Sequence, residues 1–165
     1  MRRKRRLYAA VLVLLLLLAA GCSIKSKEQY QAEILDGDLQ ASIEIRCDTI
    51  LANGGSVREE IKKLVPEDGV LVEKTTVGLP EEATARDLLQ KAAKVSDLVV
   101  NISGTKSGAY VVSIGGIGEF DCGELSGWMF YVNGERPSVG CGAYRLQEGD
   151  EVQFLYTCDL GDDLE

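Results

Sequence analysis

The stretch TARDLLQKAAKV, residues 84–95, decides the fold because it is the one segment with a clear helical period. Its apolar residues recur three or four positions apart and therefore line one face of a helix. These residues are Ala85, Leu88, Leu89, Ala92 and Val95. Thr84 and Asp87 stand where a capping box needs a hydroxyl and a carboxylate, so the helix is expected to begin at Ala85. We predict one principal amphipathic helix over residues 85–96.

Short apolar segments on both sides of this helix have the patterns of β-strands. Residues 39–47 alternate apolar and polar side chains, which is typical of a half-buried strand. Five more segments are rich in β-branched or aromatic residues, and we expect strands at residues 70–79, 98–103, 109–114, 128–132 and 151–158. The first of these could also form a hairpin. The sequence thus predicts an α+β domain in which a mixed β-sheet packs on one principal helix.

Four local signals complete the prediction. Asn133-Gly134 is a strong hairpin turn after the strand at 128–132. A capping box at Ser56–Glu59 predicts a short helix from Val57 to near Pro66. Phosphate-binding glycine loops lead into a helix, whereas Gly115–Gly118 precedes another strand, so we expect a flexible connection there. The acidic tail, residues 159–165, is expected to fray.

The amino terminus has the composition of a secretory signal. Arg2 to Arg6 are all basic, and residues 7–20 are 14 uncharged, mostly apolar residues that end in small side chains. A membrane-spanning helix needs about 20 apolar residues. The run is therefore too short to span a bilayer, and we predict a signal peptide over residues 1–21.

The end of this run, Ala19-Ala20-Gly21-Cys22, resembles the lipobox of bacterial lipoproteins. The resemblance implies that the Cys22 thiol receives a diacylglycerol and that Cys22 becomes the first mature residue. Two acyl chains give stable anchoring where one is marginal. We expect a lipoprotein at the extracytoplasmic face of the cell membrane, with residues 22–38 as a flexible tether; the alternative is a plain secretory signal.

The charge of the mature chain limits its partners. Signal removal takes away five of the 18 basic residues and none of the 26 acidic ones, which leaves 13 basic residues and a net charge of −13. Nucleic acids and anionic lipid headgroups are repelled by such a charge. We expect no nucleic-acid partner; the expected partners are the membrane, through the lipid anchor, and either a small molecule or an envelope protein.

Cys47, Cys122, Cys141 and Cys158 remain after Cys22 is lipidated. An even number in an exported chain predicts disulfides. A metal site is not expected, because the chain has no histidine and no C-x-x-C pair. We predict Cys122–Cys141 across the hairpin, and Cys47–Cys158 if the first strand joins the sheet beside the last one. Cys141–Cys158 is the alternative.

The aromatic run at residues 128–131 supplies the candidate binding residues. On a strand, Trp128 and Phe130 share one face, and Met129 and Tyr131 share the other. One face should pack under the helix. Met129 and Tyr131, together with Trp128, are our candidates for a ligand or partner surface; the alternative is that both faces are covered.

A set of spaced motifs resembles a bacterial domain of unknown function that is related to the C-terminal domain of transcobalamin, the cobalamin carrier. The motifs are Ala83-Thr84-Ala85-x-Asp87-Leu88-Leu89, Gly127-Trp128-Met129, Tyr131-Val132-Asn133-Gly134, Gly140, Tyr144, Leu146, Gly149-Asp150 and Tyr156. The resemblance implies a β-grasp-like fold, a sheet gripping one helix, which we place at residues 66–158 after a strand–helix segment at 39–65. In the carrier, the related domain closes over cobalamin held by a separate helical domain.

Two functions follow as expectations. The first is a membrane-anchored binding module that captures a corrinoid or another bulky small molecule for uptake. The second is an interaction module that docks onto another envelope protein, or onto a helical domain supplied in trans. We expect no enzyme activity and no catalytic residue, because histidine, the commonest general base, is absent. No cofactor is expected, and cobalamin is a possible ligand.

Overall fold

The computed structural model describes residues 27–53, 57–105 and 108–164. The chain divides into two compact units, residues 1–30 and 31–165, and the second contains both β-sheets. In chain order the elements are α2 (Lys27–Ile34), β1 (Leu39–Arg46), α3 (Thr49–Ala52), α4 (Glu59–Lys62), β2 (Val70–Leu79), α5 (Ala85–Val95), β3 (Val100–Ser103), β4 (Tyr110–Ile114), β5 (Ile117–Gly118), β6 (Gly127–Val132) and β7 (Glu151–Thr157).

The predicted N-terminal features fall mostly outside the described residues. The signal peptide, residues 1–21, and the lipidation site Cys22 both lie there. Within the predicted tether at 22–38, residues 27–34 form helix α2, so the prediction of an unstructured segment is wrong for them. Among the described residues, no helix combines the length and the apolar character needed to cross a membrane.

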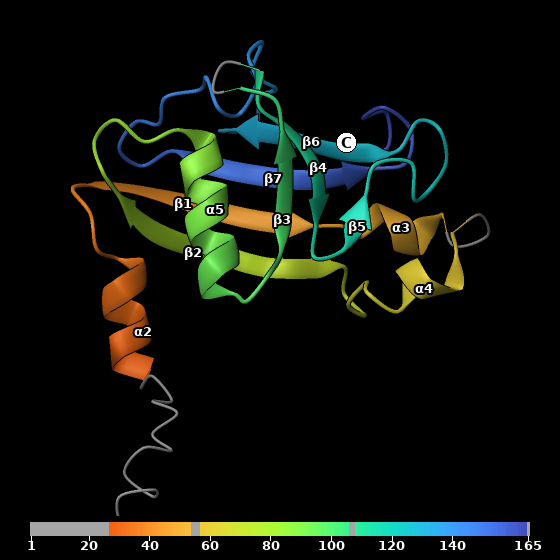
Figure 1. Cartoon of the computed structure of the whole chain (residues 1–165), viewed down its shortest axis with the longest axis horizontal. Helices are drawn as coiled ribbons and strands as arrows, with labels where there is room; N and C mark the ends of the chain where they lie inside the picture. Colours follow the sequence, from red (N-terminus) through yellow and green to blue (C-terminus); the bar gives the residue numbers. More distant parts are fainter. Residues whose placement is uncertain (1–26, 54–56, 106–107, 165) are drawn as a thin grey trace, which may run out of the picture. The chain divides into compact units, whose positions relative to one another are not determined.

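The four-stranded sheet has the order β2-β1-β7-β6 and is mixed (Figure 1). Strand β1 pairs with β2 in antiparallel and with β7 in parallel orientation, and β6 pairs with β7 in antiparallel orientation. Helix α5 lies across β1 and β2. The predicted α+β class, with one principal helix on a mixed sheet, is confirmed. The first strand joins the sheet beside the last one, as predicted.

The hydrophobic core explains why these segments form regular structure. Every second residue of β1 is buried, beginning at Leu39, which matches the alternation in the sequence. Helix α5 buries Leu88 and Leu89 completely against the sheet. Burying one such side chain contributes roughly 2 kcal/mol. Strand β1, with its period of 2 residues, and helix α5, with its period of 3.6 residues, therefore bury their apolar faces in the same core.

The capping box at the start of α5 is confirmed. The backbone N–H of Asp87 donates to Thr84 Oγ1 at 3.4 Å, and the backbone N–H of Thr84 donates to Asp87 Oδ2 at 2.9 Å. Two of the amide groups that a helix start leaves unsatisfied thus find side-chain acceptors. The helix ends at Val95, close to its predicted end.

Helix α4 is shorter than predicted. The sequence predicted a helix over 57–66, but α4 covers four residues and begins after Arg58, whose side chain makes no capping hydrogen bond. The predicted cap Ser56 lies outside the described residues. After α4 the chain continues in tighter turns, in which the N–H of Leu64 donates to Ile61 O at 2.9 Å. Helix α3 was not predicted, because four residues are too few to show a period.

The second sheet has the order β3-β4-β5 and is antiparallel throughout. Gly115 and Gly116 join β4 to β5 with φ angles of +61° and +84°, which most other residues avoid. Residues 114 and 117 pair directly across this turn. The glycines therefore form a tight hairpin and not the flexible connection that we predicted.

The Asn133-Gly134 turn forms, but its hairpin does not continue. Val132 and Glu135 exchange two backbone hydrogen bonds of 2.8 and 3.0 Å across it. No strand follows on that side within the described residues, and β6 pairs instead with β7, Gly127 opposite Thr157. The chain thus leaves the sheet after this turn and returns only at β7.

The acidic tail is ordered through residue 164, contrary to the prediction that it frays. The carboxylate of Asp163 accepts hydrogen bonds from Thr157 Oγ1 and, at 2.8 Å, from the backbone N–H of Cys158. The N–H of Leu160 donates to Leu125 O at 3.0 Å. Acidic composition suggested solvated charge, whereas one carboxylate here fixes the end of β7.

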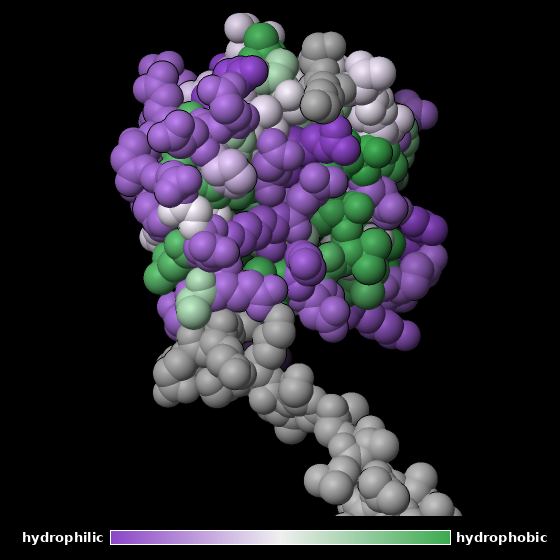
Figure 2. All heavy atoms as spheres, turned by 60° about the vertical axis from the view of Figure 1, so that its left-hand side comes forward, coloured by the Kyte–Doolittle hydropathy of each residue, from purple (hydrophilic) through white to green (hydrophobic). Residues whose placement is uncertain are grey.

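The surface agrees with the composition. On the face shown in Figure 2, hydrophilic side chains predominate and hydrophobic side chains form separate patches.

Candidate ligand-binding site

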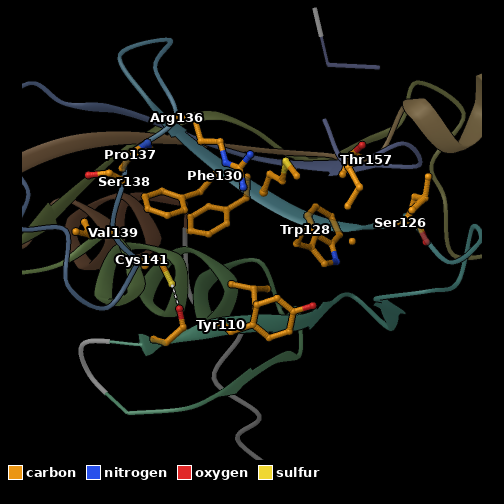
Figure 3. A pocket seen from close by; sticks show the side chains of 18 of the residues that line it. Tyr110, Ser126, Trp128, Phe130, Arg136, Pro137, Ser138, Val139, Cys141 and Thr157 are labelled. Carbon is orange, nitrogen blue, oxygen red and sulfur yellow. Dashed lines mark hydrogen bonds between the residues drawn. The ribbon is translucent and has the colours of Figure 1, made fainter. Parts of the chain in front are cut away.

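A pocket of about 420 Å³ opens between β6 and β4 (Figure 3). It is also lined by residues of two connecting segments, 120 and 124–126 of the first and 136–141 of the second, and by Leu160. Ligand pockets in proteins commonly occupy about 300–1,000 Å³ and are mainly apolar with a few polar groups. The volume and the lining of this pocket fit that description.

Trp128 forms part of the buried wall that β6 contributes. Its indole Nε1–H donates to Ile117 O at 2.8 Å, and its ring meets the edge of Tyr156 with centroids 5.2 Å apart. A buried indole N–H needs such an acceptor. The ring is therefore fixed in position, with 7% of the residue exposed.

Phe130 lies two residues along the same face of β6. It stacks on Phe154 with ring centroids 5.7 Å apart and meets Tyr144 edge-on at 6.4 Å. Figure 3 shows Trp128 and Phe130 directed into the same cavity. We call Trp128, Phe130 and Phe154 the pocket floor.

Tyr110, at the start of β4, stands on the opposite side of the cavity in Figure 3. Its hydroxyl donates to the carboxylate of Glu119. Burial raises the pKa of Tyr110 to about 12, and the hydrogen bond and charge of Glu119 act in the same direction. The phenol is therefore neutral at physiological pH.

The outer part of the pocket carries more than half of the exposed large apolar side chains among the described residues. Among the described residues, nine large hydrophobic side chains are exposed, and five of these nine line this pocket. We call these five the pocket rim: Tyr110, Phe120, Leu125, Val139 and Leu160. Contiguous exposed apolar surface marks ligand or partner sites, whereas scattered single residues do not.

Polar groups at the pocket are few. Arg136 and Glu124 contribute opposite charges. Within the described residues, no ion pair is formed by Arg136, so its guanidinium is available to an acceptor group of a ligand. Its planar donor fork suits carboxylates and phosphates.

The segment at 140–144 connects the pocket to the start of α5. The backbone N–H groups of Ala85 and Arg86 donate to Tyr144 O and Cys141 O, each at 3.0 Å. The Cys141 thiol donates to Ala109 O at 3.6 Å, the dashed line in Figure 3. Burial raises the pKa of this thiol, so Cys141 is a neutral structural group.

The structure separates the binding candidates that the sequence grouped together. Trp128 and Met129 line the pocket, whereas Tyr131 does not. Tyr131 and Met129 approach the tail at Gly161, where an added Cβ would lie 3.7 Å from the Tyr131 hydroxyl and 3.0 Å from the Met129 sulfur. Phe130 was not among the candidates, although its shared face with Trp128 was visible in the sequence.

The structure brings together a cysteine pair that the sequence did not predict. The Sγ atoms of Cys122 and Cys158 lie 2.7 Å apart. Cys141 approaches Ala109, and Cys47 is fully buried. Because β6 pairs with β7, the end of β7 lies beside the segment before β6, while residue 141 is carried to α5.

Within the described ranges, no group of three or more His, Cys, Asp or Glu side chains is placed to hold a metal ion.

Comparison with known proteins supports the fold. Residues 82–157 match a family model described as a domain of unknown function, DUF4430. The matched segment runs from the start of α5 to the end of β7, so it includes the strands on both sides of the pocket. No curated protein matches this sequence.

Among solved structures, haptocorrin in complex with Cbi is similar in fold. The TM-score is 0.52 at 16% identity, over 72% of this chain and 25% of haptocorrin. This chain thus spans a quarter of that protein, and the similarity supports the α+β fold alone. A protein from Ruminococcus gnavus, described provisionally as metal-binding, gives a TM-score of 0.44 at 9% identity over 73% of this chain and 97% of its own. That similarity is too weak to carry an argument.

Proposed function

We propose that this chain is a binding module, anchored by lipid to the extracytoplasmic face of a membrane, that holds a bulky, mainly apolar small molecule for uptake. Corrinoids are the first candidates. The observation that carries the proposal is the clustering of five of the nine exposed large apolar side chains around one pocket. When a ligand covers exposed apolar surface of this kind, the complex is stabilised by roughly 25 cal/mol per Å² of apolar surface removed from water.

The arrangement of the pocket suits a ligand with a large apolar body. The floor is fixed by aromatic stacking, so it is already formed before binding. The rim residues Phe120 and Leu160 are 63% and 60% exposed, and both gain burial when a ligand enters. Arg136 offers a cation to an anionic side group. These features favour binding over catalysis.

The N-terminal sequence supports the anchoring part of the proposal. A basic start, a short apolar core and Cys22 after small residues are typical of a lipidated, exported chain. If Cys22 carries the lipid, Cys22→Ser will release the protein from membranes or leave its precursor uncleaved. Unchanged partitioning into detergent would contradict the anchor.

Trp128 allows a direct test of ligand binding, because it is the only tryptophan in the chain and it lies at the pocket. We expect dicyanocobinamide or cyanocobalamin to quench its emission in a saturable way. Free N-acetyltryptophanamide, titrated in parallel, corrects for absorption by the corrin. Emission that follows this control up to near-millimolar ligand would rule out corrinoids, and a panel of other large apolar ligands would then test the broader proposal.

A second candidate function is docking of another envelope protein or a helical domain onto the same rim. The rim favours it, because the exposed apolar residues come from several separate segments and together form a surface that a protein could cover. Crosslinking in intact cells should then return one reproducible partner that is lost when the rim residues Phe120 and Leu160 are both changed to serine.

A further inference from the structure

The Sγ atoms of Cys122 and Cys158 lie 2.7 Å apart. A disulfide requires about 2.05 Å, so a shift of less than one ångström would bring the two sulfurs to bonding distance. Cys122 belongs to the segment between β5 and β6, and Cys158 directly follows β7. The two residues are far apart in sequence, and the pairing of β6 with β7 brings them together.

The backbone of each cysteine is held in place independently of the sulfur contact. The N–H of Cys122 donates to Ser126 Oγ at 3.0 Å, and that hydroxyl donates to Gly123 O at 2.8 Å. The N–H of Cys158 donates to Asp163 Oδ2 at 2.8 Å. Because both backbones are fixed by local hydrogen bonds, the approach of the sulfurs is a property of the fold.

The sulfur pair joins two segments that form one side of the pocket. Residues 120 and 124–128, in the segment that contains Cys122, line the pocket. Thr157 and Leu160, which flank Cys158, line it as well. The N–H of Leu160 donates to Leu125 O at 3.0 Å, and the pairing of β6 with β7 places Gly127 opposite Thr157, so backbone hydrogen bonds also join the two segments. The sulfur pair thus joins the two segments that carry the rim residues Phe120, Leu125 and Leu160.

We infer that Cys122 and Cys158 form a disulfide that clamps this side of the pocket rim, while Cys47 and Cys141 remain thiols. The bond itself follows from the geometry alone; its effect on ligand binding rests on the proposed function. The Cys141 thiol is engaged with Ala109 O, and Cys47 has no exposed surface.

Formation of the bond removes two protons and two electrons, which a disulfide-containing oxidant accepts as it becomes a dithiol. Cys158 is the more exposed of the pair, so it attacks the oxidant first, and Cys122 then displaces the reduced oxidant from the mixed disulfide. Burial raises the pKa of Cys158 to about 12, with Cys122 contributing. The attacking thiolate is therefore scarce in the folded state, so oxidation of the folded protein is slow.

Peptide mapping tests the bond. The full chain is folded in a buffer of reduced and oxidised glutathione, blocked with N-ethylmaleimide under denaturing conditions and digested with a protease that cleaves after glutamate. Glu124 and Glu135 separate Cys122 from Cys141, and Glu148 and Glu151 separate Cys141 from Cys158. We expect a linked Cys122–Cys158 peptide with Cys47 and Cys141 alkylated. A linked Cys122–Cys141 or Cys47–Cys158 peptide, or alkylation of both Cys122 and Cys158, would overturn the inference.

Stability and binding test the clamp. Dithiothreitol should lower the thermal midpoint of the wild-type protein by on the order of 10 °C. The double variant Cys122→Ser/Cys158→Ser should show no such response, and the matched control Cys47→Ala should keep it. Reduction should also weaken any ligand detected through Trp128 severalfold. If the linked peptide is present but reduction leaves the ligand affinity unchanged, the clamp is overturned and the disulfide still stands. If no ligand is found at all, the proposed function fails and the mapping result is unaffected.

Discussion

The floor and the rim of the pocket are both apolar, but they differ in how the fold uses them. Phe154 in the floor is 1% exposed and stacks on Phe130. Phe120 in the rim is 63% exposed, and the described residues give it no aromatic partner. The floor side chains stabilise the domain, whereas the rim side chains contribute little to folding. This difference supports the proposal that the rim contacts another molecule.

Truncation of the floor should give the largest effect. We expect Phe154→Ala to lower the free energy of unfolding by roughly 3–5 kcal/mol, because it removes a fully buried ring and leaves a cavity. Phe120→Ala is the matched control and should change it by about 0.5 kcal/mol or less. Urea unfolding followed by circular dichroism measures both. Equal losses for the two variants would remove the distinction between floor and rim.

Tyr156, which supports Trp128, predicts a pH dependence of stability. Burial raises its pKa from 10.0 to about 12, so the folded state holds the phenolic proton more tightly than the unfolded state. The stabilisation is complete below pH 10 and is lost as the pH rises through 12; two pKa units correspond to roughly 2–3 kcal/mol. Urea midpoints at pH 8 and pH 11 should show a decline that is smaller in Tyr156→Phe. A decline of the same size in that variant would assign it to other groups.

The cap of α5 should have a smaller effect on stability. Thr84→Ala removes the hydroxyl that accepts from Asp87 N–H and should cost about 1 kcal/mol of unfolding free energy. Ser96→Ala, at the other end of the helix, is the control, since the helix end is closed by a backbone bond to Ala92 O. The same unfolding assay applies, and a Thr84→Ala variant as stable as the wild type would show that packing alone holds the helix start.

The sequence predicted those parts of the fold that have a local period. The alternation beginning at Leu39 and the helical spacing around Leu88 sufficed for β1 and α5, because each depends on one buried face. The capping residues Thr84 and Asp87 were found for the same reason: their interaction is local in sequence.

The pocket and the cysteine contacts were less predictable, because they depend on strand order. Asn133-Gly134 correctly indicated a turn, but not that the chain then leaves the sheet, so the contact of the Cys141 thiol with Ala109 O could not be foreseen. The rim residues come from separate segments, and an exposed leucine such as Leu160 has no local signature. Trp128 was identified because aromatic residues are concentrated in β6.

Ligand affinity of rim variants tests the central claim most directly. The emission of Trp128 is followed while cobinamide is added to the wild type, to Phe120→Ser/Leu160→Ser, and to Val99→Ser, which changes an exposed apolar residue outside the pocket. We expect the rim variant to have the same free energy of unfolding as the wild type and to bind cobinamide at least about tenfold more weakly, equivalent to about 1.4 kcal/mol. Val99→Ser should bind with the affinity of the wild type. Saturable binding of equal affinity in all three proteins would contradict the assignment of the rim as the binding site.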